Sequence, residues 1–172
     1  MSTARRLFFA LWPDDAVRHA LLHWQTHNLT HDVRWQHRDD LHLTLAFLGQ
    51  VDGARVDGLR DLAAGLVAAP FALVVDEIGW WPRAQVVWAG PSSVPGELSA
   101  LHARLVEGLA GKGFVPEDRP YRPHITLARK VATEPLLGPL LPLAWRVREL
   151  ALVASCRGDA PHYRPLAHWP LA

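Results

Sequence analysis

Two short segments of the sequence carry the same four-residue pattern, and both contain side chains that exchange protons near neutral pH. His42-Leu43-Thr44-Leu45 recurs in the second half of the chain as His124-Ile125-Thr126-Leu127. Histidine has a reference pKa of about 6.5, so one imidazole can accept a proton while another donates one. Displacement at phosphorus needs such a pair, because the attacking oxygen loses a proton and the leaving oxygen gains one. The repeat therefore predicts acid–base chemistry on a phosphate group, without a metal.

The spacing within each copy predicts which side chains act together. Both copies lie in segments that we expect to be β-strands, where alternate side chains point to opposite faces. His42 and Thr44 would then share one face, as would His124 and Thr126. The two threonine hydroxyls are expected to donate hydrogen bonds to the phosphate oxygens and to stabilise developing charge. The aliphatic residues between them would bury against helices.

Three further residues are candidates for substrate contacts. Arg122 and Arg129 flank the second copy, and either guanidinium could reach the phosphate, although a solvated arginine is the alternative. Trp35 precedes the first copy and is a candidate for stacking on a nucleobase.

A metal site is the main competing interpretation of the histidines. Two histidines are too few for a zinc centre, and neither copy carries an adjacent third ligand. His19, His23, His27 and His31 recur every four residues and would form a stripe on a helix. This stripe lies away from the apolar side of that helix, so we expect it to be solvated and expect no metal in the active site.

Bulk properties limit the other function classes. The chain has 172 residues, 49% of them hydrophobic, and a net charge of +1, which argues against a non-specific nucleic-acid coat. Cys156 is the single cysteine, so an intramolecular disulfide is excluded. No apolar stretch reaches the ~18 residues that span a bilayer, and Trp12-Pro13 and two acids interrupt the N-terminal apolar run. We expect a cytoplasmic monomer without a cofactor.

The remaining pattern predicts an α+β fold, since strand and helix signals are mixed and several strands are short enough for antiparallel pairing. The expected strands cover residues 5–12, 33–35, 41–48, 71–80, 85–89, 123–129, 145–155 and 163–169, with a hairpin turn at 81–84. The expected helices follow residue 13 and cover 53–69 and 95–112. Because each half carries one copy of the motif, residues 1–172 should form a single domain with two pseudo-symmetric lobes around a cleft.

The sequence resembles the two-histidine (2H) phosphoesterases. Within them it is most similar to the bacterial and archaeal RNA 2′,3′-cyclic phosphodiesterases, also called 2′-5′ RNA ligases. The likeness runs through most of the chain and rests on two extended motifs, LHLTLAFLG at 41–49 and YRPHITLAR at 121–129. It also includes the opening segment RLFFAL at 6–11, VRW at 33–35 and the tail around Tyr163.

The resemblance implies a bilobal α+β fold and hydrolysis of a terminal 2′,3′-cyclic phosphate to a 2′-phosphate, with no cofactor. It implies that His42 donates a proton to the leaving 3′ oxygen and that His124 is the base that activates water. It also implies the reverse reaction, 2′-5′ ligation of RNA ends. Two alternatives stay open: the same chemistry on small cyclic nucleotides, and a non-catalytic module that binds nucleotides or RNA ends.

Overall fold

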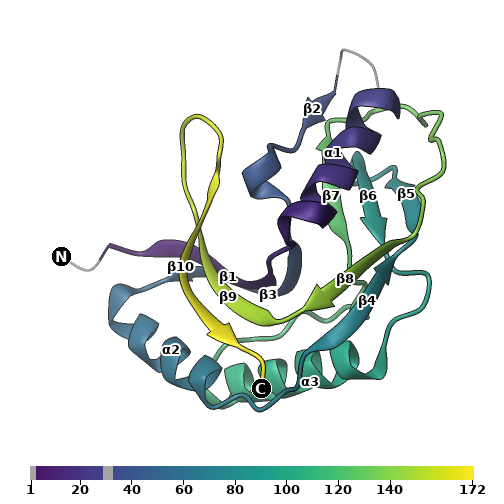
Figure 1. The fold of residues 1–172 in the computed structure, drawn as a ribbon. Helices are drawn as coiled ribbons and strands as arrows, with labels where there is room; N and C mark the ends of the chain where they lie inside the picture. The colour runs from purple at the N-terminus through teal and green to yellow at the C-terminus, as the bar shows by residue number, and fades with distance from the viewer. Residues whose placement is uncertain (1–2, 29–32) are drawn as a thin grey trace.

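The α+β prediction is confirmed by the computed structural model, which describes residues 3–28 and 33–172 (Figure 1). The helices are α1 (Asp15–Asn28), α2 (Val56–Ala64) and α3 (Gly96–Gly111). The strands are β1 (Arg5–Leu11), β2 (Arg34–Trp35), β3 (Leu43–Val51), β4 (Phe71–Val75), β5 (Glu77–Trp81), β6 (Val86–Gly90), β7 (Ile125–Arg129), β8 (Leu143–Val147), β9 (Glu149–Ser155) and β10 (Tyr163–Pro170). Over the described residues, none of the helices is long and apolar enough to cross a membrane.

Most of the strands belong to one antiparallel sheet. Its order is β10-β9-β1-β3-β7-β6-β5, with β2 also paired to β7, while β4 and β8 form a separate pair. The centre of the large sheet is its narrowest point, because β3 and β7 are paired only at Leu43 and Ile125. Both copies of the motif therefore lie in one continuous sheet, and the division into two pseudo-symmetric lobes stays a prediction.

The two faces of the large sheet differ in what covers them. Along β1, Leu7, Phe9 and Leu11 are fully buried in the main hydrophobic core. Phe8 and Ala10 alternate with them and belong to a separate small apolar cluster. This alternation follows from the pleat of a strand, which sends successive side chains to opposite faces. One face therefore builds the core, and the other is left to form the site described below.

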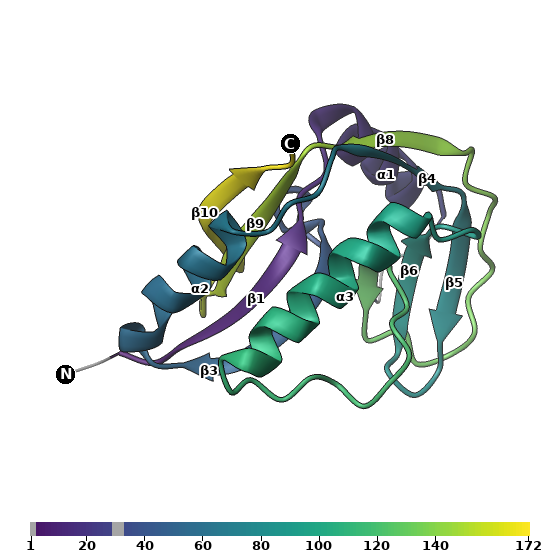
Figure 2. The same ribbon diagram turned by 90° about the horizontal axis from the view of Figure 1, so that it is seen from below.

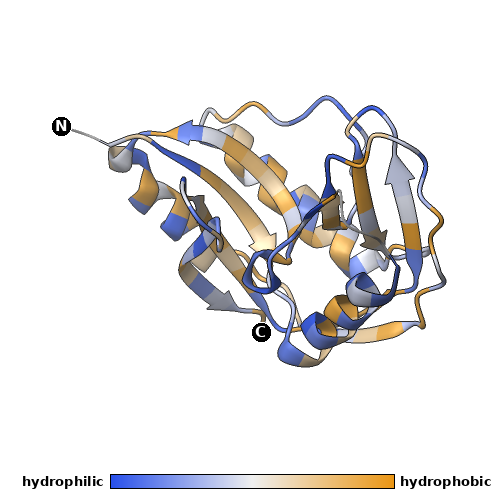
Figure 3. Ribbon diagram, turned by 90° about the horizontal axis from the view of Figure 1, so that it is seen from above, coloured by the Kyte–Doolittle hydropathy of each residue, from blue (hydrophilic) through white to orange (hydrophobic). Residues whose placement is uncertain are grey.

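The helices cover the core face of the sheet. Figure 2 shows α2 and α3 lying side by side across β1 and β3, and Figure 3 shows the apolar residues concentrated along the strands and on parts of the helices. In α3, leucines recur at helical spacing and all are buried: Leu98, Leu101, Leu105 and Leu109. Helix α1 is tied to β7 by Gln25, whose side-chain amide donates to the carbonyl oxygen of Leu127 (2.8 Å).

Two of the strands expected from the sequence are each divided in the structure. The segment 71–80 splits at Asp76 into β4 and β5, and the segment 145–155 splits at Arg148 into β8 and β9. In both cases the chain passes from one sheet to the other, so β4 pairs with β8 while β5 pairs with β6. The Asp76 carboxylate stabilises its break by accepting bonds from the backbone N–H and hydroxyl of Ser92 (both 2.7 Å).

Two expected boundaries are also wrong. Strand β3 does not stop near Gly49 but continues to Val51, because Gly49 adopts a φ of +69° next to an irregularity in the pairing with β1. The helix expected at 53–69 is shorter: α2 ends at Ala64, and Gly65 donates back to the carbonyl oxygens of Asp61 and Leu62. The expected hairpin at 81–84 is confirmed as the connection between β5 and β6.

Candidate active site

The two copies of the repeated motif meet at the centre of the sheet. Leu43 of the first copy pairs with Ile125 of the second, and both are fully buried. The residues immediately before this pair, His42 and His124, therefore lie on either side of the junction. Both histidines and both motif threonines line a single cavity of about 960 Å³. The structure thus brings together the four side chains that the sequence grouped by type and spacing.

Each imidazole is oriented by the same local hydrogen bond. The Nδ1–H of His42 donates to the carbonyl oxygen of Asp40 (2.7 Å), and that of His124 donates to the carbonyl oxygen of Arg122 (2.8 Å). A carbonyl oxygen only accepts, so Nδ1 carries the proton in each neutral ring and Nε2 is left for chemistry. The Thr44 hydroxyl lies 3.0 Å from Nε2 of His42, so the two side chains meet as expected, although His42 lies one residue before β3 and not within it.

His42 is surrounded by aromatic rings. Its ring centroid lies 4.8 Å from that of Phe8, 4.8 Å from that of Tyr163 and 5.8 Å from that of Trp12. This burial disfavours the imidazolium and is the main reason why the pKa of His42 falls to about 4. The positive charge of Arg129 lowers this pKa further, and the hydrogen bond to Asp40 opposes the change.

His124 is less enclosed. Its ring meets that of Trp81 edge-to-face at 4.5 Å between centroids. Partial burial lowers the pKa of His124, and the positive charges of Arg129, Arg122 and Arg119 lower it further. The hydrogen bond to the Arg122 carbonyl acts in the opposite direction. Arg129 therefore acts on both histidines, and its side chain lines the cavity that contains them.

Asp40 connects His42 to the C-terminal strands. It is 1% exposed, and its two carboxylate oxygens accept from the backbone N–H groups of His162 (2.8 Å) and Tyr163 (2.9 Å). Its own carbonyl oxygen accepts the Nδ1–H of His42. One residue thus orients the imidazole and holds the Tyr163 ring against it. We did not identify Asp40 from the sequence, where its position two residues before His42 was the only available signal.

The other candidates from the sequence differ in whether they line the cavity of the two histidines. Arg129 lines the cavity of the two histidines and a neighbouring cavity. Arg122 is exposed, with its guanidinium carbon 5.2 Å from the centroid of the Trp81 ring. Trp35 lines only the neighbouring cavity, so its role in base stacking stays a prediction. Trp81 and Phe8, which we did not select from the sequence, line the histidine cavity instead.

The histidine stripe on the first helix is only partly described. The His23 and His27 rings lie 4.3 Å apart, and Nδ1 of His27 is 2.7 Å from the carbonyl oxygen of His23. His31 lies outside the described residues. Within residues 3–28 and 33–172, no group of three or more histidine, cysteine, aspartate or glutamate side chains is placed to hold a metal ion.

Known proteins share both the sequence and the fold. The RNA 2′,3′-cyclic phosphodiesterase of Escherichia coli is 38% identical over 99% of each chain, and that of Thermus thermophilus is 34% identical over 96% of this chain and 90% of the relative. The crystal structure of E. coli LigT complexed with 3′-AMP superposes with a TM-score of 0.90, at 34% identity over 98% of this chain and 99% of the other.

A family model also matches most of the chain. The model of the 2′-5′ RNA ligase superfamily covers residues 13–159, a range that includes both copies of the histidine motif. The match in sequence runs from end to end, and the match in fold includes the sheet that carries the two motifs. The resemblance seen in the motifs is therefore confirmed, and the chain belongs to the 2′-5′ RNA ligase superfamily.

Proposed function

We propose that this protein hydrolyses 2′,3′-cyclic phosphates at RNA 3′ ends and leaves a 2′-phosphate and a free 3′ hydroxyl. The observation that supports this most directly is the pair of imidazoles, each with Nδ1 bonded to a carbonyl and Nε2 left for proton transfer, in one cavity with Arg129. The relatives from E. coli, Thermus thermophilus and Geobacillus stearothermophilus are named for this activity.

The proposed reaction is one in-line displacement. Nε2 of His124 takes a proton from a water molecule as its oxygen bonds to phosphorus. The bond between phosphorus and the 3′ oxygen breaks, and Nε2 of His42 gives that oxygen a proton. His42 ends neutral and His124 ends protonated, so exchange with solvent resets both. The same sequence with the 5′ hydroxyl of a second RNA in place of water would form a 2′-5′ phosphodiester and release the 3′ oxygen, which is 2′-5′ ligation.

In this mechanism three side chains stabilise the negative charge on the phosphate. Thr44 and Thr126 line the cavity of the two histidines, and we expect their hydroxyls to donate to the non-bridging oxygens. The Arg129 guanidinium adds a positive charge that acts on both imidazoles. In the unliganded protein the Thr44 hydroxyl lies 3.0 Å from Nε2 of His42, so we expect it to turn from that nitrogen to the phosphate when substrate binds.

Acid catalysis by His42 requires that substrate binding raises its pKa. In the unliganded protein this pKa is about 4, so the ring is neutral at pH 7. A bound cyclic phosphate carries a negative charge and would sit beside the imidazole, which favours the protonated form. In our mechanism, the substrate therefore helps to protonate the group that later protonates the leaving oxygen.

The first test is hydrolysis of a short RNA that ends in a 2′,3′-cyclic phosphate, carried out in excess EDTA. We expect full turnover under these conditions and a 2′-phosphate as the product, because the two imidazoles supply both proton transfers. Chromatography against the authentic 2′ and 3′ isomers identifies the product. A protein that binds such ends without turnover at any pH would be a binding module, and turnover only after zinc or manganese is added would contradict the two-histidine mechanism.

The pH dependence of kcat/KM is expected to be displaced toward acid. This parameter reports the free protein, in which the pKa of both histidines lies below the usual 6.5. The active form needs one ring protonated and the other neutral. Its population therefore falls about tenfold per pH unit once the pH exceeds the higher of the two values.

The dependence of kcat should lie at higher pH than that of kcat/KM, because the bound phosphate raises the pKa of His42. Initial rates between pH 4 and 9, at low and at saturating substrate, measure both profiles. A kcat/KM that stays level or increases from pH 7 to 9 would contradict this prediction. The two pKa values that such a profile gives belong to the coupled pair of histidines rather than to either residue. The profile alone therefore does not assign which histidine is the acid and which is the base.

A further inference from the structure

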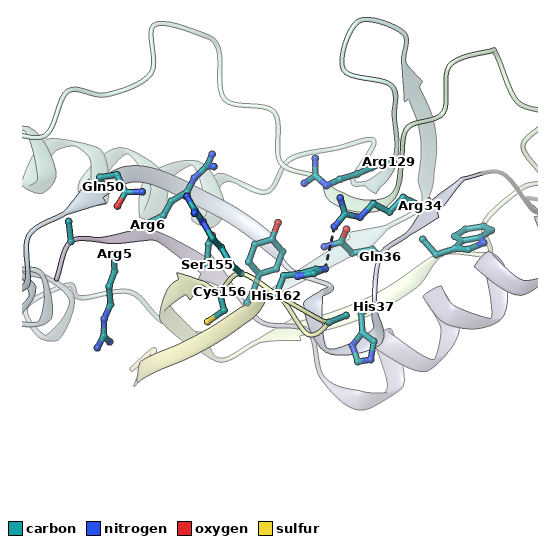
Figure 4. Close-up of a pocket in the computed structure, with 16 residues that line it drawn as sticks. Arg5, Arg6, Arg34, Gln36, His37, Gln50, Arg129, Ser155, Cys156 and His162 are labelled. Carbon is teal, nitrogen blue, oxygen red and sulfur yellow. Dashed lines mark hydrogen bonds between the residues drawn. The ribbon is translucent and has the colours of Figure 1, made fainter.

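A second cavity, of about 740 Å³, opens beside the one that holds the histidines. The two cavities share four lining residues: Arg6, Arg129, Ser155 and Tyr163. Figure 4 shows the second cavity between the start of β1, the segment around β2 and the connection from β9 to β10. A molecule whose phosphate lies between the histidines can therefore extend directly into it.

The lining of this second cavity is strongly basic. Among its 16 described lining residues, none is aspartate or glutamate, although the whole chain has a net charge of only +1. Its arginines are Arg5, Arg6, Arg34, Arg129 and Arg157. Arg5 points away from Arg6 in Figure 4, so we define the basic arm as the remaining four arginines together with His162. This clustering favours an anionic occupant.

Two of these arginines are held in an arrangement that is unfavourable without an anion. Arg34 in β2 pairs directly with Arg129 in β7, and like charges at opposed positions in a sheet are destabilising. The Arg34 guanidinium also contacts His162, whose Nε2 lies 3.4 Å from Nη2 of Arg34 (Figure 4). A histidine side chain carries no negative charge, so it does not neutralise the arginine. Over the described residues, none of the four arginines of the basic arm forms an ion pair with a carboxylate.

The position of the basic arm indicates which anion it would hold. A nucleotide with its cyclic phosphate between the histidines has its 5′ oxygen on the other side of the ribose, where the next phosphodiester begins. Arg129 lines both cavities and so spans this step. Guanidinium groups present paired donors that match phosphate oxygens, whereas the aromatic residues of the histidine cavity suit a base.

We propose that the basic arm binds the phosphodiester on the 5′ side of the reacting nucleotide, so that the protein prefers oligonucleotide ends to mononucleotide cyclic phosphates. This inference rests on the proposed function and names the substrate class of that site. In this proposal Arg34 is a specificity residue, because its side chain lines the second cavity and does not line the cavity of the two histidines.

The test compares substrates that differ by one charge. The first is a dinucleotide that ends in a 2′,3′-cyclic phosphate, and the second is the same dinucleotide with an uncharged methylphosphonate linkage. We expect kcat/KM to be about tenfold or more higher for the charged linkage, because a hydrogen bond to a charged group contributes that much. This ratio should decrease with salt, with a logarithmic slope of about −0.7 for each single-strand phosphate that is contacted.

Arg34→Ala should reduce this ratio toward one. Arg146→Ala is the matched control, since it removes the same charge from an exposed position in β8 and should leave the ratio unchanged. A wild-type ratio near one, with both dinucleotides hydrolysed, would overturn the basic arm and leave the proposed function standing.

A binding measurement tests the basic arm independently of turnover. Fluorescence anisotropy of the two dinucleotides with 2′-phosphate ends should show tighter binding of the charged linkage in the wild type and a smaller difference in Arg34→Ala. Equal affinities for the two linkages in the wild type would overturn the inference even if neither cyclic substrate were hydrolysed, whereas that loss of hydrolysis by itself would count against the proposed function.

Discussion

Replacement of His124 by alanine is expected to lower kcat for a 2′,3′-cyclic phosphate end by about 10²-fold or more, because the loss of a proton-transfer group typically costs about 10²–10⁴-fold. His42→Ala should cost a similar factor. The two variants should differ in stability, however. His42 also fills a space between three aromatic rings, so its removal should weaken packing as well, whereas His124 is only half-buried.

The losses should be strongly non-additive, since the two imidazoles serve one proton cycle. The double variant is therefore expected to be little slower than the slower single variant. His168→Ala provides the matched control, because this histidine lies in β10 beside Glu149 (3.2 Å) and lines neither cavity. Single-turnover rates with circular dichroism as the check on folding provide the measurement. A folded His124→Ala protein with an undiminished rate would exclude the proposed mechanism.

Replacement of Asp40 by alanine is expected to affect stability and catalysis together. It removes the acceptor of two partly buried backbone N–H groups, those of His162 and Tyr163. An orphaned buried donor costs about 1–3 kcal/mol, so the free energy of unfolding should fall by about 3 kcal/mol. Urea unfolding measures this change, with the slope against denaturant as the check that the transition is still two-state.

The catalytic effect of Asp40→Ala should arise through Tyr163. Once its backbone is released, the Tyr163 ring no longer encloses His42, and water reaches the imidazole. Loss of the Asp40 charge by itself lowers the pKa of His42, but burial is the larger cause of its shift. The pKa of His42 in the free protein should therefore rise from about 4 toward its usual value, which would move the acid limb of kcat/KM to higher pH. A purely structural role for Asp40 would lower stability without moving this limb.

Asp159→Ala is the matched control for Asp40→Ala. Asp159 is exposed in the same connection between β9 and β10 and carries the same charge, and it lines neither cavity. We expect it to leave both stability and the pH profile close to those of the wild type. An Asp40→Ala protein that matched this control in both measurements would show that the carboxylate does not hold the C-terminal strands against His42.

Local patterns in the sequence are sufficient to predict which motif residues share a face. A strand sends alternate side chains to opposite faces whatever surrounds it, so the spacing of His42 and Thr44 is enough to group them. The same holds for the buried leucines of α3, which follow the helical period. The strand divisions at Asp76 and Arg148 could not be predicted this way, because both sides of each break are equally apolar and only the pairing partner changes.

The sequence by itself thus determined the types of the reacting groups, the face that they share and the family to which the chain belongs. The tertiary structure alone decided their environment. Phe8, Trp12 and Tyr163 come from opposite ends of the chain to enclose His42, and this burial lowers its pKa. The basic arm likewise combines residues from four separate segments. Burial and electrostatic coupling depend on neighbours in space, which spacing along a single chain does not specify.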